Sequence, residues 1–148
     1  MLVSTKGRYA LRVLVDMAEH RTADYMPLRE IARRQNISEK YLESIVKAMV
    51  QGGVLAGMRG KGGGYRLSRS PDQITAGEVL RISEGSLSPV SCLEDGAPPC
   101  ARTEECRTLS MWRGLDKLIQ DYLDGVTIAD LMCGGCPDHS DAGGGAER

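Results

Sequence analysis

The sequence predicts a mainly α-helical protein with one small β-hairpin, and three observations lead to this fold class. Apolar residues recur at helical spacing along most of the chain, a glycine-rich segment separates two short strand-like runs, and 148 residues suit about one domain. Hydrophobic residues make up 41% and charged residues 26%, which is typical of a globular chain. There is no signal-peptide pattern and no apolar run near the roughly 18 residues of a membrane span, so we expect a cytoplasmic protein.

Three helices joined by short turns are predicted first. Residues 4–20 carry apolar side chains at helical spacing, which indicates an amphipathic helix. Residues 27–35 predict a short second helix with Pro27 in its first turn, where a missing N–H costs nothing. Ser38 is a suitable N-cap for a third helix over 39–51, which a glycine pair ends.

A β-hairpin is predicted next. Two strand-like runs, 54–58 and 65–67, flank a glycine cluster whose turn carries Arg59 and Lys61. Glycine-rich loops can also bind nucleotide phosphates, but a helix follows those loops, whereas a strand follows here. Two helices around a tight turn and then a basic hairpin give the order of a winged helix-turn-helix, in which the hairpin is the wing.

The region after the hairpin begins with a helix. Thr75 and Glu78 predict a capping box that opens this helix, which continues through about Ser83. Residues 85–106 are polar and contain prolines and cysteines, so they predict a loop.

A long helix is predicted over residues 107–124, and Thr127 with Asp130 caps a short last helix. The long helix carries a broad apolar stripe made by Trp112, Leu115, Leu118, Ile119, Tyr122 and Leu123. A single helix this amphipathic needs another surface to cover it, which suits a dimerisation helix. The glycine-rich tail, 133–148, is predicted to be disordered.

Charge is distributed unevenly along the chain. Residues 1–70 hold 13 Lys and Arg against 6 Asp and Glu, a charge of +7, whereas residues 71–148 hold 6 against 14, a charge of −8. A basic first part joined to an acidic second part predicts a surface that faces a polyanion.

The third helix and the wing carry the candidate DNA contacts, which are Ser38, Lys40, Tyr41, Glu43, Lys47, Arg59 and Lys61. Lysines can bind phosphates or guanine edges, and Glu43 can accept a hydrogen bond from cytosine N4. Arginine on a wing suits the negative potential of a narrow minor groove. One alternative is that Glu43 only pairs with Lys40 or Lys47 on its own helix. Another is a winged helix that binds protein, which would not need so many basic residues.

Five segments of the sequence resemble the Rrf-two family of bacterial regulators, over residues 1 to about 132. They read STKGRYAL, ISEKYLE, RGKGGGYRL, ITAGEVLR and EGSLSPV. The resemblance implies a homodimeric winged-helix transcription factor that binds a palindromic operator in double-stranded DNA. It also implies that helix 39–51 reads the major groove, that Arg59 enters the minor groove, and that helix 107–124 pairs across the dimer.

All five cysteines lie in the acidic part, and Cys92, Cys100 and Cys106 share the predicted loop. Soft thiolates select iron–sulfur clusters or zinc, and the spacing alone leaves both open. The resemblance to IscR-like members implies an iron–sulfur cluster held by these three cysteines, first of the 2Fe-2S type, with 4Fe-4S as the alternative.

The fourth cluster ligand is left open. IscR-like members carry a His three residues after the third cysteine, where this chain has Leu109, and NsrR-like members use an Asp where this chain has Arg8. Glu104 and Glu105 beside Cys106 are the candidates, and a small thiol, a water molecule or a tail cysteine would also serve.

A second pair of cysteines, Cys133 and Cys136, stands three residues before His139. It predicts either a partial metal site or a tail without metal. With two histidines in all, and no Ser/His/Asp or Cys/His pairing, the chain offers little material for acid–base catalysis, so we do not expect an enzyme.

Together these features predict a transcriptional regulator that senses iron–sulfur cluster status and controls cluster biogenesis or related genes. The alternatives are a CymR-like repressor of cysteine and sulfur metabolism and an NsrR-like nitric-oxide or redox sensor. Candidate partners besides DNA are iron–sulfur assembly proteins or cysteine synthase. The expected parts are a DNA-binding domain (1–70), a connecting helix with the cluster loop (71–106), the dimerisation helix with a short last helix (107–132) and the tail (133–148).

Overall fold

A computed structural model of the chain describes residues 3–135. Its elements are α1 (Thr5–Glu19), α2 (Leu28–Gln35), α3 (Glu39–Gln51), β1 (Leu55–Met58), β2 (Gly64–Leu67), the 3₁₀-helix η1 (Pro71–Gln73), α4 (Ala76–Glu84), the 3₁₀-helix η2 (Ser91–Leu93), α5 (Leu109–Asp124) and α6 (Ile128–Met132). The mainly helical fold with a two-stranded antiparallel sheet confirms the predicted fold class.

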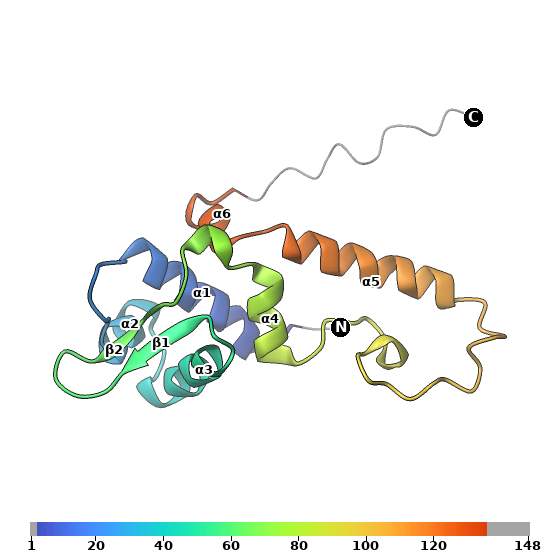
Figure 1. Ribbon diagram of the computed structural model, residues 1–148, viewed down its shortest axis with the longest axis horizontal. Coiled ribbons are helices and arrows are strands. Elements are labelled where there is room, and N and C mark those ends of the chain that lie inside the picture. The colour runs from blue at the N-terminus through green and yellow to red at the C-terminus, as the bar shows by residue number, and fades with distance from the viewer. Residues whose placement is uncertain (1–2, 136–148) are drawn as a thin grey trace.

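The molecule has two unlike parts (Figure 1). Helices α1 to α4, the hairpin and α6 gather into one body, which we call the globular half. Residues 85–124, which comprise the loop with η2 and helix α5, project from it and are called the arm.

The helix-turn-helix begins and ends at residues with clear local causes. Ser38 caps α3 by accepting a hydrogen bond from the N–H of Tyr41, with an Oγ–N distance of 3.2 Å. Asn36 closes α2 with a left-handed backbone, φ 53°, which asparagine tolerates better than most residues. Helix α2 begins at Leu28 rather than at Pro27, because Pro27 has an extended backbone and takes the N-cap position.

The main core cluster lies in the globular half, and Leu87, near the start of the arm, is also buried. Its fully buried side chains come from one face of α1, one face of α3 and the elements packed beside them, and they include Val13, Leu14, Met17, Leu42, Ile45, Val46, Met49, Val54, Ile74 and Ile128. After the arm, the chain returns to this half, where the N–H of Ile128 donates a hydrogen bond to the carbonyl of Ile74 at 2.9 Å. None of the residues of α5 is buried.

The wing is fastened to the loop between α1 and α2. Tyr65 and Met26 exchange two backbone hydrogen bonds of 2.8 and 2.9 Å. Gly64, at φ +148°, stands where a side chain would clash with the backbone of Met26. The start of β2 therefore requires glycine for close approach as well as for backbone conformation.

The predicted capping box at Thr75 is only half formed. The Thr75 hydroxyl accepts a hydrogen bond from the N–H of Glu78 at 3.1 Å. The Glu78 carboxylate, however, binds Arg69 at 2.5 Å instead of accepting from the backbone N–H of Thr75. A complete capping box occurs at α6, where Asp130 accepts from the N–H of Thr127 at 2.8 Å. These bonds, the one from the Thr127 N–H first, lower the pKa of Asp130.

Helix α5 differs from the prediction in two ways. It begins at Leu109 rather than at 107, and its predicted stripe is divided between two faces. Trp112 and Ile119 are half-buried, whereas Leu115 and Leu118 are 39% and 69% exposed. Spacing alone could not show which apolar side chains face the rest of the chain.

Two further expectations concern membrane-spanning helices and the cysteine-containing tail. Within residues 3–135, no helix is both long and apolar enough to span a membrane. Cys133 ends α6 and is exposed, whereas Cys136, His139 and the rest of the predicted disordered tail lie outside the described residues.

Candidate nucleic-acid interface and cysteine loop

Helix α3 turns a polar face outward because its apolar face is buried. Leu42, Ile45, Val46 and Met49 point into the core, which leaves Ser38, Lys40, Glu43 and Lys47 exposed on the opposite side. Tyr41 is half-buried, and its ring meets that of Tyr9 on α1 edge-on, with centroids 5.9 Å apart. Five of the predicted DNA contacts therefore lie together on α3 and its N-cap: four are exposed, and Tyr41 is half-buried beside them.

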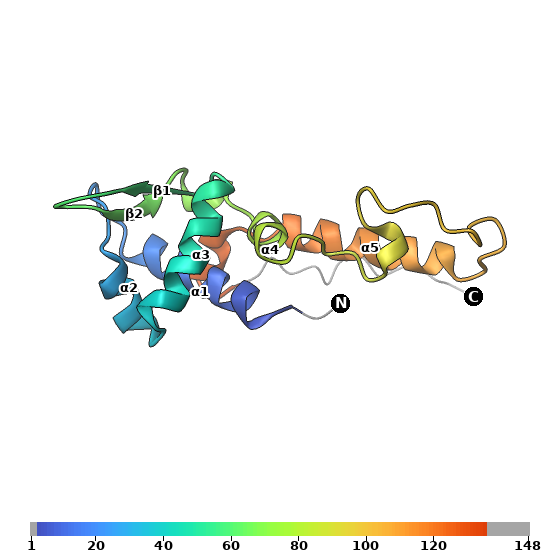
Figure 2. The same cartoon turned by 90° about the horizontal axis from the view of Figure 1, so that it is seen from below.

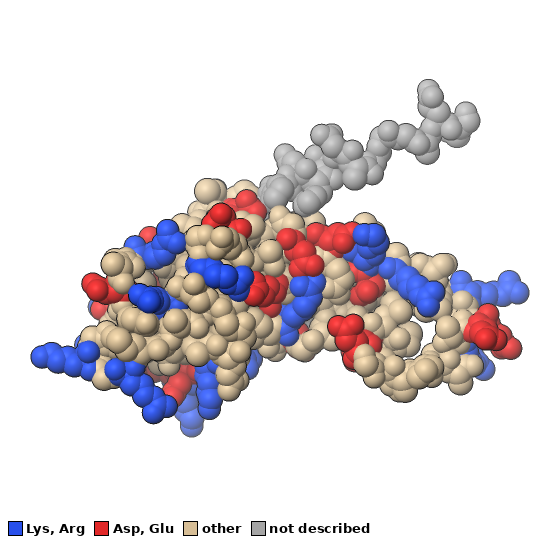
Figure 3. Space-filling model, in the orientation of Figure 1, with Lys and Arg blue, Asp and Glu red and all other residues tan. Residues whose placement is uncertain are grey.

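A groove of about 800 Å³ runs between α3 and the wing. Its lining brings together Glu43 and Lys47 of α3 with Arg59 of the wing, and Arg29 of α2 also reaches it. Lys61 lies further out on the hairpin turn and is exposed. Lys and Arg side chains gather along this edge of the globular half and at the tip of the hairpin (Figure 3).

The basic side chains of this face are not neutralised. Among residues 3–135, Lys40, Lys47, Arg59 and Lys61 take part in no ion pair. Glu43 pairs with neither neighbouring lysine within the same part of the chain, so its carboxylate can accept a hydrogen bond from a base. Sequence reasoning missed Arg29, whose signal is an exposed basic position on the helix that braces α3.

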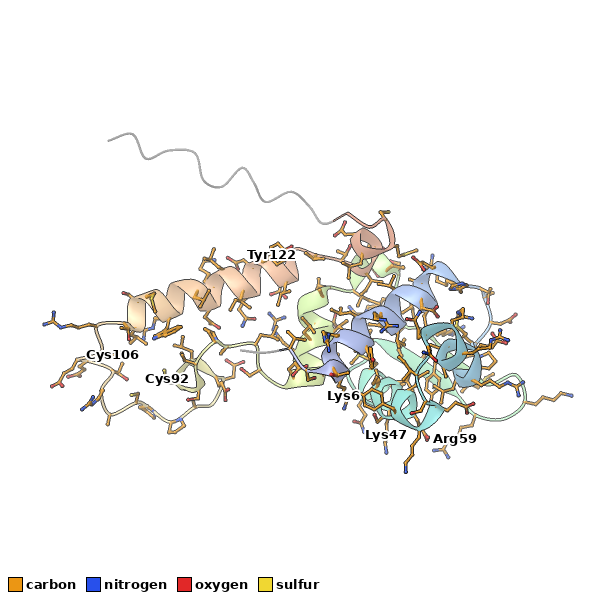
Figure 4. The ribbon with its side chains drawn as sticks, turned by 180° about the vertical axis from the view of Figure 1, so that it is seen from behind. Lys6, Lys47, Arg59, Cys92, Cys106 and Tyr122 are labelled. Carbon is orange, nitrogen blue, oxygen red and sulfur yellow. The ribbon has the colours of Figure 1, made fainter. Side chains whose placement is uncertain are left out.

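The three loop cysteines lie at the far end of the molecule from this face. Figure 4 shows Cys92 and Cys106 in the arm, well separated from Lys47 and Arg59. Cys92, Cys100 and Cys106 are all exposed, as are Glu104 and Glu105. Within residues 3–135, no three Cys, His, Asp or Glu side chains lie together closely enough to hold a metal ion. The loop supplies the right donor atoms without bringing them to one point.

Cys106 has a distinctive environment. Hydrogen bonds lower the pKa of its thiol: first from the Thr108 hydroxyl, 3.5 Å from the sulfur, and then from the N–H groups of Thr108 and Leu109. The thiolate is the form of cysteine that binds metals and reacts as a nucleophile. The chemistry of this donor set fits a soft metal centre.

The arm is joined to the globular half by charged contacts. Arg81 of α4 binds the Asp124 carboxylate with distances of 2.7 and 2.9 Å and also donates to Gln120. Glu84, the last residue of α4, accepts hydrogen bonds from the N–H and the hydroxyl of Ser4 at 3.1 and 2.6 Å. The loop therefore starts directly after a residue that holds the beginning of α1.

Residues 3–134 match the model of the Rrf2 family, which is described as an iron-dependent transcriptional regulator. The chain belongs to the Rrf2 family. This is the Rrf-two family that the sequence motifs resemble, so the predicted membership is confirmed.

Two curated Rrf2 relatives illustrate the range of the similarity. The HTH-type transcriptional regulator IscR of Aliivibrio salmonicida (strain LFI1238) is 37% identical over 132 residues, which cover 89% of this chain and 77% of the relative. The HTH-type transcriptional regulator CymR of Bacillus subtilis (strain 168) is 38% identical over 131 residues, which cover 88% and 89%.

Solved structures agree with this assignment. CymR (YrzC), the global cysteine regulator of B. subtilis, superposes with a TM-score of 0.71 at 36% identity and covers 90% of this chain and 97% of its own. IscR of T. potens superposes with a TM-score of 0.69 at 32% identity and covers 98% and 94%. This Rrf2 protein is thus a winged-helix, DNA-binding transcriptional regulator and not an enzyme, as the sequence predicted.

Proposed function

We propose that this Rrf2 regulator acts in the cytoplasm, senses iron–sulfur cluster status through Cys92, Cys100 and Cys106, and controls cluster biogenesis or related genes. The observation that carries the proposal is the placement of three exposed thiols in one loop between α4 and α5. The lowered pKa of Cys106 favours the thiolate that iron binds. The description of the family as iron-dependent agrees with this chemistry.

The cysteines and the glutamates of the loop have defined roles in this proposal. The three cysteines bind iron as thiolates, and Glu104 or Glu105, exposed beside Cys106, offers an oxygen for a fourth position. A bound cluster, of the 2Fe-2S type in the first place, would supply a redox-active centre that holds the loop together. Gly85 begins the loop directly after Glu84, so a change in the loop is passed to Ser4 and the first turn of α1.

The apolar face of α5 is the proposed dimer interface. Met111, Leu115 and Leu118 are 55%, 39% and 69% exposed, and they follow one another at intervals of four and three residues. That spacing places them on one stripe of the helix, where a second copy of α5 can cover them. A two-fold dimer presents two copies of α3 to the two halves of a palindromic operator.

On DNA, we assign α3 to the major groove and the wing to the neighbouring minor groove. Lys40 and Lys47 bind phosphates or guanine edges, Ser38 and Tyr41 lie at the amino end of the same helix, and Glu43 discriminates by accepting from cytosine N4. Arg59 enters the minor groove and Lys61, on the wing turn, binds phosphate.

Metal content tests the cluster proposal. Protein reconstituted anaerobically with iron and sulfide is expected to be coloured and to contain both elements. Cys92→Ala, Cys100→Ala and Cys106→Ala should each lose the visible absorption, because each removes one thiolate. Cys133→Ala is the matched control, since Cys133 is an exposed cysteine outside the loop, and it should keep the colour. Zinc without iron, or colour lost only in the control, would contradict the assignment.

A second candidate is a CymR-like repressor of cysteine and sulfur metabolism, with cysteine synthase as its partner. The similarity to CymR over nearly the whole of both chains favours it, and so does the spread of the loop cysteines within the described residues. If the reconstituted protein binds no iron, and added cysteine synthase changes its affinity for an operator, this second candidate is correct and the first is wrong.

A further inference from the structure

The beginning of α1 lies directly beside α3. The rings of Tyr9 and Tyr41 meet edge-on at 5.9 Å and 76°, which fixes the amino-terminal turns of α1 against the first turn of α3. Lys6 precedes Tyr9 by three residues, and residues three apart share a face of an α-helix. Lys6 is therefore on the side of α1 that turns toward α3.

Lys6 also shares an edge of the molecule with the DNA-binding residues. In Figure 4, Lys6, Lys47 and Arg59 follow one another along the same edge of the globular half, with Lys47 in the middle. Figure 2 views the molecule from that edge, with α3 between the wing on one side and the beginning of α1 on the other. The basic face is thus wider than the groove between α3 and the wing.

The charge of Lys6 is available, whereas those of its basic neighbours on α1 are partly engaged. Arg12 lies over the Tyr9 ring at 4.9 Å and donates to Gln35, and Arg8 donates to the Thr5 hydroxyl at 3.3 Å. Within residues 3–135, Lys6 takes part in no ion pair or side-chain hydrogen bond.

The backbone that carries Lys6 is firmly held. The Ser4 hydroxyl accepts from the N–H of Gly7 at 3.1 Å and donates to Glu84 at 2.6 Å, so the first turn of α1 is tied to the end of α4. Gly7 packs so closely here that a side chain would clash with the Glu84 carboxylate. A cation on a fixed turn loses less conformational freedom on binding than one on a frayed end.

We infer that Lys6 binds a DNA backbone phosphate on the side of α3 opposite the wing. The major groove is about 12 Å wide and is bordered by a phosphate backbone on each side, so a helix within it needs supports on both sides. The wing supplies one support and Lys6 supplies the other. Phosphate contacts fix orientation without reading sequence, so Lys6 sets how α3 lies in the groove.

The salt dependence of operator binding tests this inference. Replacing Lys6 by Gln leaves one phosphate per protomer without its cation, so the slope of log K against log salt should fall by about 0.9 for each such phosphate. Lys6→Arg should restore the slope. Lys117→Gln is the matched control, because Lys117 is an exposed lysine on α5 that pairs with Asp121, and it should leave the slope unchanged. Thermal unfolding of each variant checks that folding is retained.

A duplex with neutral methylphosphonate linkages identifies the phosphate itself. Replacing the phosphate that Lys6 binds should make Lys6→Gln and the unsubstituted protein bind equally well, whereas replacements elsewhere should preserve the difference between them. An unchanged salt slope in Lys6→Gln overturns the inference. A changed preference among operator sequences also overturns it, because it would make Lys6 a base contact.

Discussion

The globular half and the arm differ in how completely each is packed by its own residues. The globular half buries a continuous core, with side chains such as Leu42 and Ile45 fully removed from solvent. The arm buries no residue of α5 and leaves Leu118 69% exposed. The DNA-binding part is therefore complete within one chain, whereas the arm presents surfaces and ligands that a second chain or a metal centre can cover.

The face of α3 and the region around α5 differ in how particular charges are used. Arg81 of α4 pairs with Asp124, and Lys117 of α5 pairs with Asp121. On the α3 face, the lysines take part in no ion pair among the described residues. Charges that are paired internally contribute little to attracting DNA, whereas the unpaired lysines of the α3 face keep their attraction for phosphates.

Truncating one apolar side chain in each part should give very different losses of stability. Ile45→Ala is expected to lower the free energy of unfolding by about 2–5 kcal/mol, because it leaves a cavity in a closed core. Leu118→Ala should change it by less than about 0.5 kcal/mol in dilute, dissociated chains, because Leu118 is already exposed. Urea denaturation measures both values.

The same pair of variants should behave in the opposite way in self-association. Leu118→Ala is expected to weaken dimer formation in analytical ultracentrifugation, because it removes part of the proposed α5 interface. Similar losses of folding stability in the two variants would show that the arm is packed as tightly as the globular half.

Local signals explain how much of the fold the sequence predicts. Helix α3 has the predicted bounds, because Ser38 and the glycine pair act within their own segment. The predicted box at Thr75 is incomplete because Arg69, nine residues from Glu78, takes the carboxylate. A contact of that kind depends on the fold rather than on the spacing within one helix.

The candidate DNA-binding site, like the fold, is predictable from the sequence only where local spacing determines it. The exposed face of α3 follows from its apolar stripe, so its spacing is enough to name Lys40, Glu43 and Lys47. Lys6 has no such signal, because the periodicity of α1 marks only its core face and its place beside α3 depends on the Tyr9–Tyr41 contact. The spread of the loop cysteines is not predictable either, because a loop has no periodicity that fixes side-chain positions.

Two glycine substitutions should show how strongly the wing depends on the globular half. Gly64→Ala is expected to cost roughly 2–4 kcal/mol of unfolding free energy, because it combines backbone strain with a clash against Met26. Gly62→Ala is the matched control at φ +76°, where no atom lies within 4 Å of the added carbon, and strain alone should cost about 1–2 kcal/mol. Equal losses in urea denaturation would mean that the contact of the wing with Met26 is not what makes glycine necessary at 64.

The smallest expected effect concerns the reactivity of one thiol in the arm. The Thr108 hydroxyl is the largest cause of the lowered pKa of Cys106, so Thr108→Val should raise that pKa while the two N–H groups still hold it below its ordinary value. Thr108 makes no side-chain capping bond, so α5 should keep its length. The pH at which Cys106 is half-maximally alkylated by iodoacetamide, followed by peptide mass spectrometry, should therefore move upward. The shift should be modest, because water competes for an exposed thiolate.

Thr103→Val is the control, since the Thr103 hydroxyl donates to the carbonyl of Cys100 and does not touch the Cys106 sulfur. An unchanged or lower midpoint in Thr108→Val, or an equal rise in the control, would show that the environment of Cys106 does not depend on this hydroxyl.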